Sequence, residues 1–267
     1  MRDFHRPPQV TEKLYSTRVR GVFIAGTDTS VGKTVIAGAI ARTLSSQGID
    51  VGVMKPIETG CRTSKGKLIP ADGTYLKAAA CSTDRIESVT PYAYKDPIAP
   101  YAASMRDKRR VRMETIVKAY DRLRHKHSFL IVEGVGGLMV PLTSDVDLLD
   151  LILLLDLPVL LVARSGLGTL NHTLLTVRYG SEHHVRFVGV ILNQTSPKKS
   201  LADETNPEIL AGRLSIPLAG PFPYFKKTGI LEKDIEHSTV LFMKNTLMKE
   251  MVFSWVRSGE KKTNDGS

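Results

Sequence analysis

The sequence predicts an α/β fold built on a doubly wound, mostly parallel sheet with helices on both faces. The first observation is that strand-like apolar runs alternate with helix-like segments along the 267 residues, which is typical of a parallel sheet covered on both sides. The second is a Gly-Lys-Thr loop over residues 26–34, which joins the first apolar run to a helical segment. A loop of this kind between a strand and a helix indicates the phosphate-loop NTPase type of this fold.

The expected elements follow one another in a regular order. The expected strands are 22–25, 51–54, 129–132, 158–163, 187–192 and 217–219. The expected helices are 35–41, 72–80, 106–126, 169–179 and 207–214, and the apolar segment 148–155 precedes the fourth strand. Segment 63–70 is interpreted as a loop. Segment 240–256 is interpreted as an amphipathic helix that packs on the sheet or on a second subunit, with membrane docking as the alternative.

One domain accounts for the length and the composition. With 42% hydrophobic residues, the chain is long enough to bury a sizeable core, and we expect a single nucleotide-binding α/β domain over residues 21–257. Residues 1–20 and 258–267 are expected to be mobile tails. The apolar stretch 148–163 is interrupted by two aspartates and a proline, so it falls short of the ~18 apolar residues that a membrane span needs.

The two cysteines indicate the cellular compartment. Cys61 and Cys81 have neither metal-ligand spacing nor a disulfide framework around them, and no signal-peptide pattern occurs at the N-terminus. We therefore expect a soluble protein of the reducing cytoplasm, with no membrane partner.

The positive charge is concentrated in one segment. The formal net charge is +10, and residues 106–126 contain nine Lys or Arg against three acidic residues. Apolar residues recur there at helical spacing, at positions 113, 116, 117, 120 and 123, so we interpret the segment as a helix with one buried stripe and a basic, solvated face. An anion-binding or nucleic-acid surface is the alternative, but no RNA-binding aromatic motif or helix-turn-helix pattern supports it. We expect no nucleic-acid partner.

The Gly-Lys-Thr loop supplies groups that bind nucleotide phosphates. Backbone N–H groups of the turn and of the helix N-terminus point at the phosphates, Lys33 reaches their β and γ oxygens, and the Thr34 hydroxyl holds Mg²⁺. The first glycine stands one residue early and Thr27 takes the usual glycine position, so the loop is a variant. An ordinary strand-to-helix turn is the alternative. The predicted phosphate-binding residues are Gly26, Thr27, Asp28, Thr29, Ser30, Val31, Gly32, Lys33 and Thr34.

Polar residues stand where three of the expected strands end. Glu133 ends the strand 129–132 and is followed by glycines that let the backbone approach a ligand. In phosphate-loop enzymes such an acid coordinates Mg²⁺ or orients its water; a strand-end cap is the alternative. Lys55 ends another strand, where a second lysine would stabilise charge on a transferring phosphoryl group unless it is an ordinary surface lysine. Asn193 ends a third.

Several short segments occur in a fixed order from about residue 21 to 224: Gly26-Thr27-Asp28-Thr29, Val31-Gly32-Lys33-Thr34, Lys55-Pro56, Thr59-Gly60, Asp72, Val132-Glu133-Gly134, Gly136-Gly137 and Gly168-Thr169-Leu170-Asn171-His172. Together, in this order and at family-like spacing, they resemble the dethiobiotin synthetases. The resemblance implies an ATP-dependent ligase that closes the ureido ring of dethiobiotin from diaminopelargonic acid and carbon dioxide, with Mg²⁺ as a cofactor.

The resemblance also implies a role for each matching residue. Thr34, Asp72 and Glu133 would surround Mg²⁺. Lys33 and Lys55 would contact the phosphates and the substrate carbamate, and Thr29 and Thr59 would hold the reacting end of the substrate. The nucleotide would further meet Gly136, and its adenine would meet Asn193 and Pro223. The substrate carboxylate would be bound by Gly168, Thr169 and Asn171 from the neighbouring subunit of a homodimer.

Some positions depart from the family pattern, and two other classes compete. Ser30 stands where some members have an acid, which leaves the number of bound cations open, and the base preference is equally open. The basic segment 106–126 and the long N-terminal tail are not family hallmarks. A partition or septum-positioning ATPase shares the fold, but its loop carries a lysine where Asp28 stands here. An amidotransferase-type ligase of corrin biosynthesis would need a further domain with a nucleophilic cysteine, for which we expect no room after residue 225.

Overall fold

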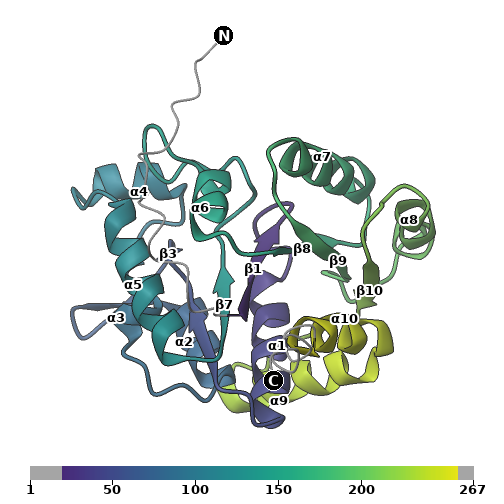
Figure 1. The fold of residues 1–267 in the computed structure, drawn as a ribbon, viewed down its shortest axis with the longest axis horizontal. Helices are drawn as coiled ribbons and strands as arrows, with labels where there is room; N and C mark the ends of the chain where they lie inside the picture. The colour runs from purple at the N-terminus through teal and green to yellow at the C-terminus, as the bar shows by residue number, and fades with distance from the viewer. Residues whose placement is uncertain (1–19, 258–267) are drawn as a thin grey trace, which may run out of the picture.

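A six-stranded parallel sheet forms the centre of the molecule in a computed structural model that describes residues 20–257 (Figure 1). The strand order is β10-β9-β8-β1-β7-β2, and every neighbouring pair runs parallel. The strands are β1 (Arg20–Gly26), β2 (Val51–Met54), β7 (Phe129–Glu133), β8 (Val159–Arg164), β9 (Phe187–Asn193) and β10 (Leu218–Phe222). The predicted sheet is confirmed, and each of its six strands overlaps a strand predicted from the sequence.

Helices cover both faces of this sheet. On one face lie α1 (Lys33–Ser46), α2 (Ala71–Ala79), α9 (Leu231–Lys244) and α10 (Thr246–Arg257). On the other lie α4 (Pro100–Arg106), α5 (Met113–Lys126), α6 (Leu148–Leu155), α7 (Thr169–Glu182) and α8 (Leu201–Ala211). The short α3 (Ile86–Val89) and two small sheets, β3 (Ile57–Glu58) with β6 (Tyr92–Ala93) and β4 (Arg62–Ser64) with β5 (Lys67–Ile69), complete the elements.

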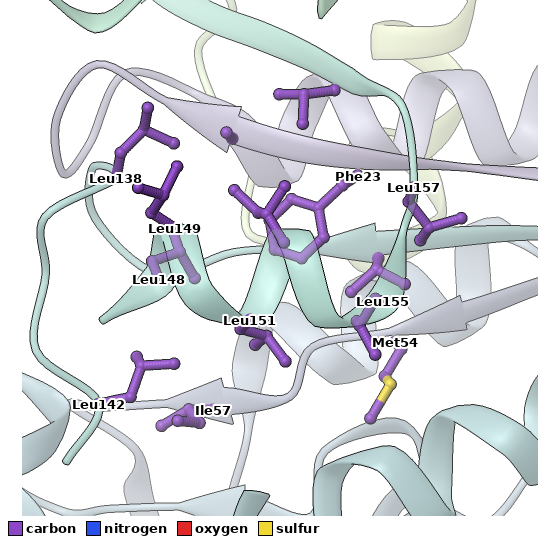
Figure 2. Packing of buried hydrophobic residues seen from close by; sticks show 14 of the residues in the cluster. Phe23, Met54, Ile57, Leu138, Leu142, Leu148, Leu149, Leu151, Leu155 and Leu157 are labelled. Carbon is purple, nitrogen blue, oxygen red and sulfur yellow. The ribbon is translucent and has the colours of Figure 1, made fainter. Parts of the chain in front are cut away.

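Alternate residues of β1 divide the core into two layers. Val22 and Ile24 point to the α1 face, whereas Phe23 points to the α6 face, because successive strand residues face opposite sides. Figure 2 shows Phe23 among the leucines of α6, with Met54 of β2 close by. All these side chains are buried, as a sheet with helices on both faces requires.

The basic segment is not one continuous helix as predicted. α4 ends at Arg106 and α5 begins at Met113, and between them Lys108 has a positive φ of 51°. The intervening Arg109 donates to the Pro91 carbonyl and lies over the Tyr92 ring, 5.2 Å from its centroid. These tertiary contacts hold the break. The predicted buried stripe is present in α5, which buries Ile116, Ala119, Tyr120 and Leu123.

Two further expectations need correction. α8 spans Leu201–Ala211 rather than 207–214, because Ser200 and Asp203 form a capping box that starts the helix six residues before Pro207. The loop expected at 63–70 is a β4–β5 hairpin, whose turn residues Lys65 and Gly66 both have the positive φ of a tight hairpin turn.

The C-terminal amphipathic segment forms the end of α9 and all of α10, with the break at Asn245. Phe242, Met248 and Val252 are fully buried in the α1-side core. Packing on the fold, the more ordinary of the two explanations, is therefore confirmed. No helix within residues 20–257 is long and apolar enough to cross a membrane. The expected tails lie outside the described residues, apart from Arg20 in β1.

Candidate active site

The phosphate loop lies between β1 and α1, at the carboxyl edge of the sheet. It enters α1 through Gly32, which has a φ of 97°. A Cβ at this position would collide with the side-chain amide of Asn193 at the end of β9. Both the left-handed backbone and the close approach therefore require glycine here, and the turn delivers Lys33 as the first residue of the helix.

Lys33 joins the phosphate loop to the loop that follows β7. Its ammonium donates to the carbonyl oxygens of Asp28 at 2.8 Å and of Gly136 at 3.0 Å, and the side chain is buried. Burial, followed by the nearby positive charge of Lys55, lowers the pKa of Lys33 to about 8. At neutral pH the side chain still carries its charge for most of the time, so it can attract phosphate oxygens.

Lys55 is the centre of a buried ionic cluster. Its ammonium lies 2.6 Å from Glu133 Oε1 and 3.1 Å from Asp72 Oδ2, and it also donates to the Gly134 carbonyl at 3.2 Å. Burial alone would lower the pKa of Lys55, but the carboxylates of Glu133 and Asp72 outweigh it and raise the pKa above its ordinary value. Lys55 is therefore a permanent cation that holds two carboxylates together, and not a surface lysine.

Oxygen ligands suitable for Mg²⁺ surround this cluster. Thr34 Oγ1 donates to Glu133 Oε1 at 2.9 Å, whereas Glu133 Oε2 is buried without a hydrogen-bond partner. The Asp72 carboxylate also contacts Lys55, and Lys55 holds the pKa of Asp72 below its usual value against the opposing effect of burial. One hydroxyl and two carboxylates fit Mg²⁺, which binds through one or two carboxylates together with substrate phosphates and water. Residues 20–257 hold no cluster of three or more His, Cys, Asp or Glu residues suited to a metal.

These side chains line one cavity of about 360 Å³. The predicted residues that the structure brings together there are Thr29, Ser30, Gly32, Lys33, Thr34, Lys55, Thr59, Asp72, Glu133 and Gly136. Val35, Glu58, Val135 and Lys227 complete the lining. Residues from the phosphate loop, α1, α2, β7 and the position directly after β2 thus converge, which makes this cavity the candidate active site.

The two residues expected to contact adenine lie beyond the cavity lining. Asn193 is buried, and its Nδ2 donates to the Val31 carbonyl at 2.8 Å, so it braces the phosphate loop from the β9 side. Pro223 follows β10 directly and is exposed. Their contact with a base stays a prediction.

The expected carboxylate-binding turn also lies outside this cavity. Gly168 and Asn171 are exposed at the start of α7, whereas Thr169 is buried and its hydroxyl pairs with that of Thr173 at 3.1 Å. The turn is held from α8, because Asn206 Nδ2 donates to the carbonyls of Ser165 at 2.8 Å and Gly166 at 3.1 Å. No substrate contact follows from these positions within one chain, so their role stays a prediction.

Comparison with known proteins places the chain in a family. A family model described as an AAA domain matches residues 20–229. An ATP-dependent dethiobiotin synthetase BioD of Thermodesulfovibrio yellowstonii is 41% identical over 222 residues, which cover 80% of this chain and 91% of that protein. A second one, of Bacillus licheniformis, is 40% identical and is covered to 86%. The chain belongs to the dethiobiotin synthetase family.

A solved structure agrees with the fold. The ParA family ATPase from Chlorobium tepidum TLS superimposes with a TM-score of 0.51 over 90% of this chain and 99% of its own, at 13% identity. At that identity the likeness concerns the fold alone. It confirms the predicted sheet type, while the much closer dethiobiotin synthetases decide against a partition ATPase.

Two residues of this candidate site escaped the sequence analysis. Glu58 is buried and accepts hydrogen bonds from the backbone N–H groups of Asp72 and Gly73, at 3.0 Å each, so it caps α2 and holds Asp72 toward the cavity. Lys227 enters the cavity wall from the segment after β10. Neither has a local signal, because the cap comes from another segment of the chain and Lys227 belongs to an ordinary Lys-Lys pair.

Proposed function

We propose that this protein is an ATP-dependent cyclo-ligase that forms dethiobiotin from diaminopelargonic acid and carbon dioxide. The observation that carries the proposal is the convergence of Lys33 and Lys55 with Thr34, Asp72 and Glu133 on one cavity. Family membership supplies the substrates, since the relatives are named as ATP-dependent dethiobiotin synthetases. We place the reaction in the cytoplasm, where the free thiols of Cys61 and Cys81 would stay reduced.

The proposed reaction has three steps, and none needs a protein nucleophile. One amine of the substrate adds to carbon dioxide and gives a carbamate. A carbamate oxygen then attacks the γ-phosphorus of ATP, and ADP leaves. The second amine attacks the carbonyl carbon of the mixed anhydride, which closes the ring and releases phosphate.

The side chains of the cavity suit the second step. A carbamate and a γ-phosphate are both anions and repel each other, so their approach needs fixed positive charge. Lys33 and Lys55 provide it, since both ammonium groups are held by buried hydrogen bonds before any substrate binds. Thr29 and Thr59 line the same cavity and would orient the reacting end of the substrate.

Thr34, Asp72 and Glu133 are the residues that would hold Mg²⁺. When bound there, the ion would supply charge neutralisation for the phosphate oxygens. The buried Glu133 Oε2, which lacks a protein hydrogen-bond partner, supports this assignment, because an orphaned buried oxygen is costly unless a ligand satisfies it.

The first prediction tests the function. ADP should form rapidly only when ATP, Mg²⁺, diaminopelargonic acid and bicarbonate are all present, and omission of any one should stop turnover. A coupled assay of ADP release measures this, with product mass spectrometry to identify dethiobiotin. ADP release that is indifferent to the diamine and to bicarbonate would contradict the proposal and favour a stand-alone ATPase.

We further infer a homodimer in which the partner subunit supplies the carboxylate-binding turn. Support comes from position: the turn at the start of α7 lies apart from the cavity of its own chain, and Leu167 beside it is 90% exposed. The N-terminus of a 14-residue helix is suited to hold a carboxylate.

The second prediction tests this assembly. Asn171→Ala and Lys33→Ala should each be inactive alone, but a mixture of the two should recover activity, because hybrid dimers contain one site with both residues intact. Random mixing would restore about a quarter of the wild-type sites. Activity of the unfolded and refolded mixture, with sedimentation to check the dimer, measures it. A fully active monomer, or no recovery in a mixture shown to contain hybrids, would contradict the shared site.

A further inference from the structure

Lys227 is a cavity residue that the proposed reaction has not used. It lies in the segment between β10 and α9 and lines the cavity beside Thr34 and Asp72. Its ammonium lies 5.9 Å from the centroid of the Tyr75 ring, which belongs to α2. The lysine therefore reaches the cavity from the edge of the sheet, at the mouth next to α2.

The backbone after Lys227 is anchored although it forms no helix or strand. The buried carboxylate of Asp234 accepts hydrogen bonds from the backbone N–H and the hydroxyl of Thr228, both at 2.7 Å, and from Gly229 N–H at 3.2 Å. Phe225 on the other side packs edge-on against His237, with 5.2 Å between ring centroids. The position of Lys227 is thus fixed at its base, while its side chain is exposed.

The charges around the cavity leave Lys227 a distinct role. Three lysines and three carboxylates line it. Lys33 is already held by two carbonyl oxygens, and Lys55 by two carboxylates and a carbonyl. Within residues 20–257, by contrast, the Lys227 ammonium contacts a ring face and makes no hydrogen bond or close ion pair. All three of its N–H groups remain available to a ligand.

A nucleoside triphosphate would bring negative charge to the part of the cavity that Lys227 lines. Without Lys227 the lining would contain three carboxylates against two lysines, a net negative wall for an incoming triphosphate. An anion that enters beside Asp72 meets Lys227 as the one cavity cation, within the described residues, whose three donors are all free.

We propose that Lys227 is a nucleotide-binding residue, whose ammonium contacts phosphate oxygens of the bound nucleoside triphosphate from the α2 side of the cavity mouth. The inference rests on the proposed function only in that the cavity receives a triphosphate. It adds to the phosphate loop a third cation, which comes from the segment after β10, the edge strand of the sheet.

The chain offers a matched control in the neighbouring Lys226. This residue is also exposed and carries the same charge, but it does not line the cavity. Lys226→Gln therefore changes the long-range field of the protein as Lys227→Gln does, without removing the contact. Any difference between the two variants isolates the contact at Lys227.

The experiment is calorimetric titration with Mg²⁺ and adenosine 5′-(β,γ-imido)triphosphate, without diamine or bicarbonate. We expect Lys227→Gln to weaken binding about tenfold, the scale of one charge-assisted hydrogen bond. Lys226→Gln should change it less than about twofold, and Lys227→Arg should keep most of the affinity, because the guanidinium also binds phosphate. The thermal unfolding midpoints without ligand should match, since the lysine is exposed.

Two outcomes overturn the inference: unchanged affinity in Lys227→Gln, or an equal loss in Lys226→Gln and Lys227→Gln. The test is separate from that of the proposed function, because it measures nucleotide binding without turnover. A selective loss of affinity in Lys227→Gln supports the assignment even if dethiobiotin is not the product. Normal turnover with unchanged affinity removes Lys227 from the site and leaves the proposed function intact.

Discussion

Replacement of Lys55 by alanine should lower kcat by roughly 100-fold or more, the scale observed when a preorganised charge-stabilising group is removed. The Lys55 ammonium is buried and fixed by Glu133, Asp72 and the Gly134 carbonyl before substrate arrives, so its charge needs no rearrangement at the moment of transfer. Nucleotide binding should survive in large part, because Lys33 and the backbone N–H groups of the phosphate loop remain.

Steady-state ADP release and calorimetric titration with the imido analogue measure the two effects separately. Lys67→Ala is a suitable control, since Lys67 is an exposed lysine of the β4–β5 hairpin that does not line the cavity. Far-UV circular dichroism must show that Lys55→Ala is folded. A kcat within tenfold of wild type, or a parallel loss of nucleotide binding and turnover, would contradict a role of Lys55 in the chemical step.

The central sheet was predictable because its strands are buried on both faces. Such strands are nearly continuous apolar runs, as in 22–25, 129–132 and 158–163, and they need no partner to be recognised in the sequence. The break between α4 and α5 was not predictable, since it depends on contacts of Arg109 with Pro91 and Tyr92, which come from a distant segment.

The sequence predicted which residues form the candidate site, but not which of them form ion pairs with one another. That Lys55 and Glu133 end parallel strands places both at one edge of a sheet, but their ion pair requires β2 and β7 to be neighbours. The order of the strands in the sheet cannot be inferred from their order along the chain. Lys227 was missed for a related reason, because contacts with α9 hold the segment after β10 beside the cavity: the Asp234 hydrogen bonds and the packing of Phe225 on His237.

The buried pair of Lys55 and Glu133 should also govern stability. Glu133→Gln should lower the free energy of unfolding by about 3 kcal/mol, because it leaves the Lys55 ammonium buried with Asp72 as its remaining carboxylate. Glu133 is fully buried, so water cannot replace the lost charge. Urea unfolding in Mg²⁺-free buffer measures the change.

The pH dependence has a definite sign. In the folded protein the pKa of Lys55 is raised, so the stability from this pair is fully present below the ordinary lysine pKa and is lost as the pH rises through the folded value. The stability that the Lys55 charge contributes to the unsubstituted protein should therefore be constant from neutral pH to about pH 10.

A second variant separates the unpaired charge from other effects of the substitution. In Lys55→Met/Glu133→Gln the buried Lys55 ammonium is removed together with its partner, so the double variant should be more stable than Glu133→Gln alone, although both lack groups needed for catalysis. If the losses of unfolding free energy in Lys55→Met and in Glu133→Gln add up to the loss in the double variant, Lys55 and Glu133 do not stabilise each other. The short distance between them would then reflect only their shared position at the ends of two adjacent strands.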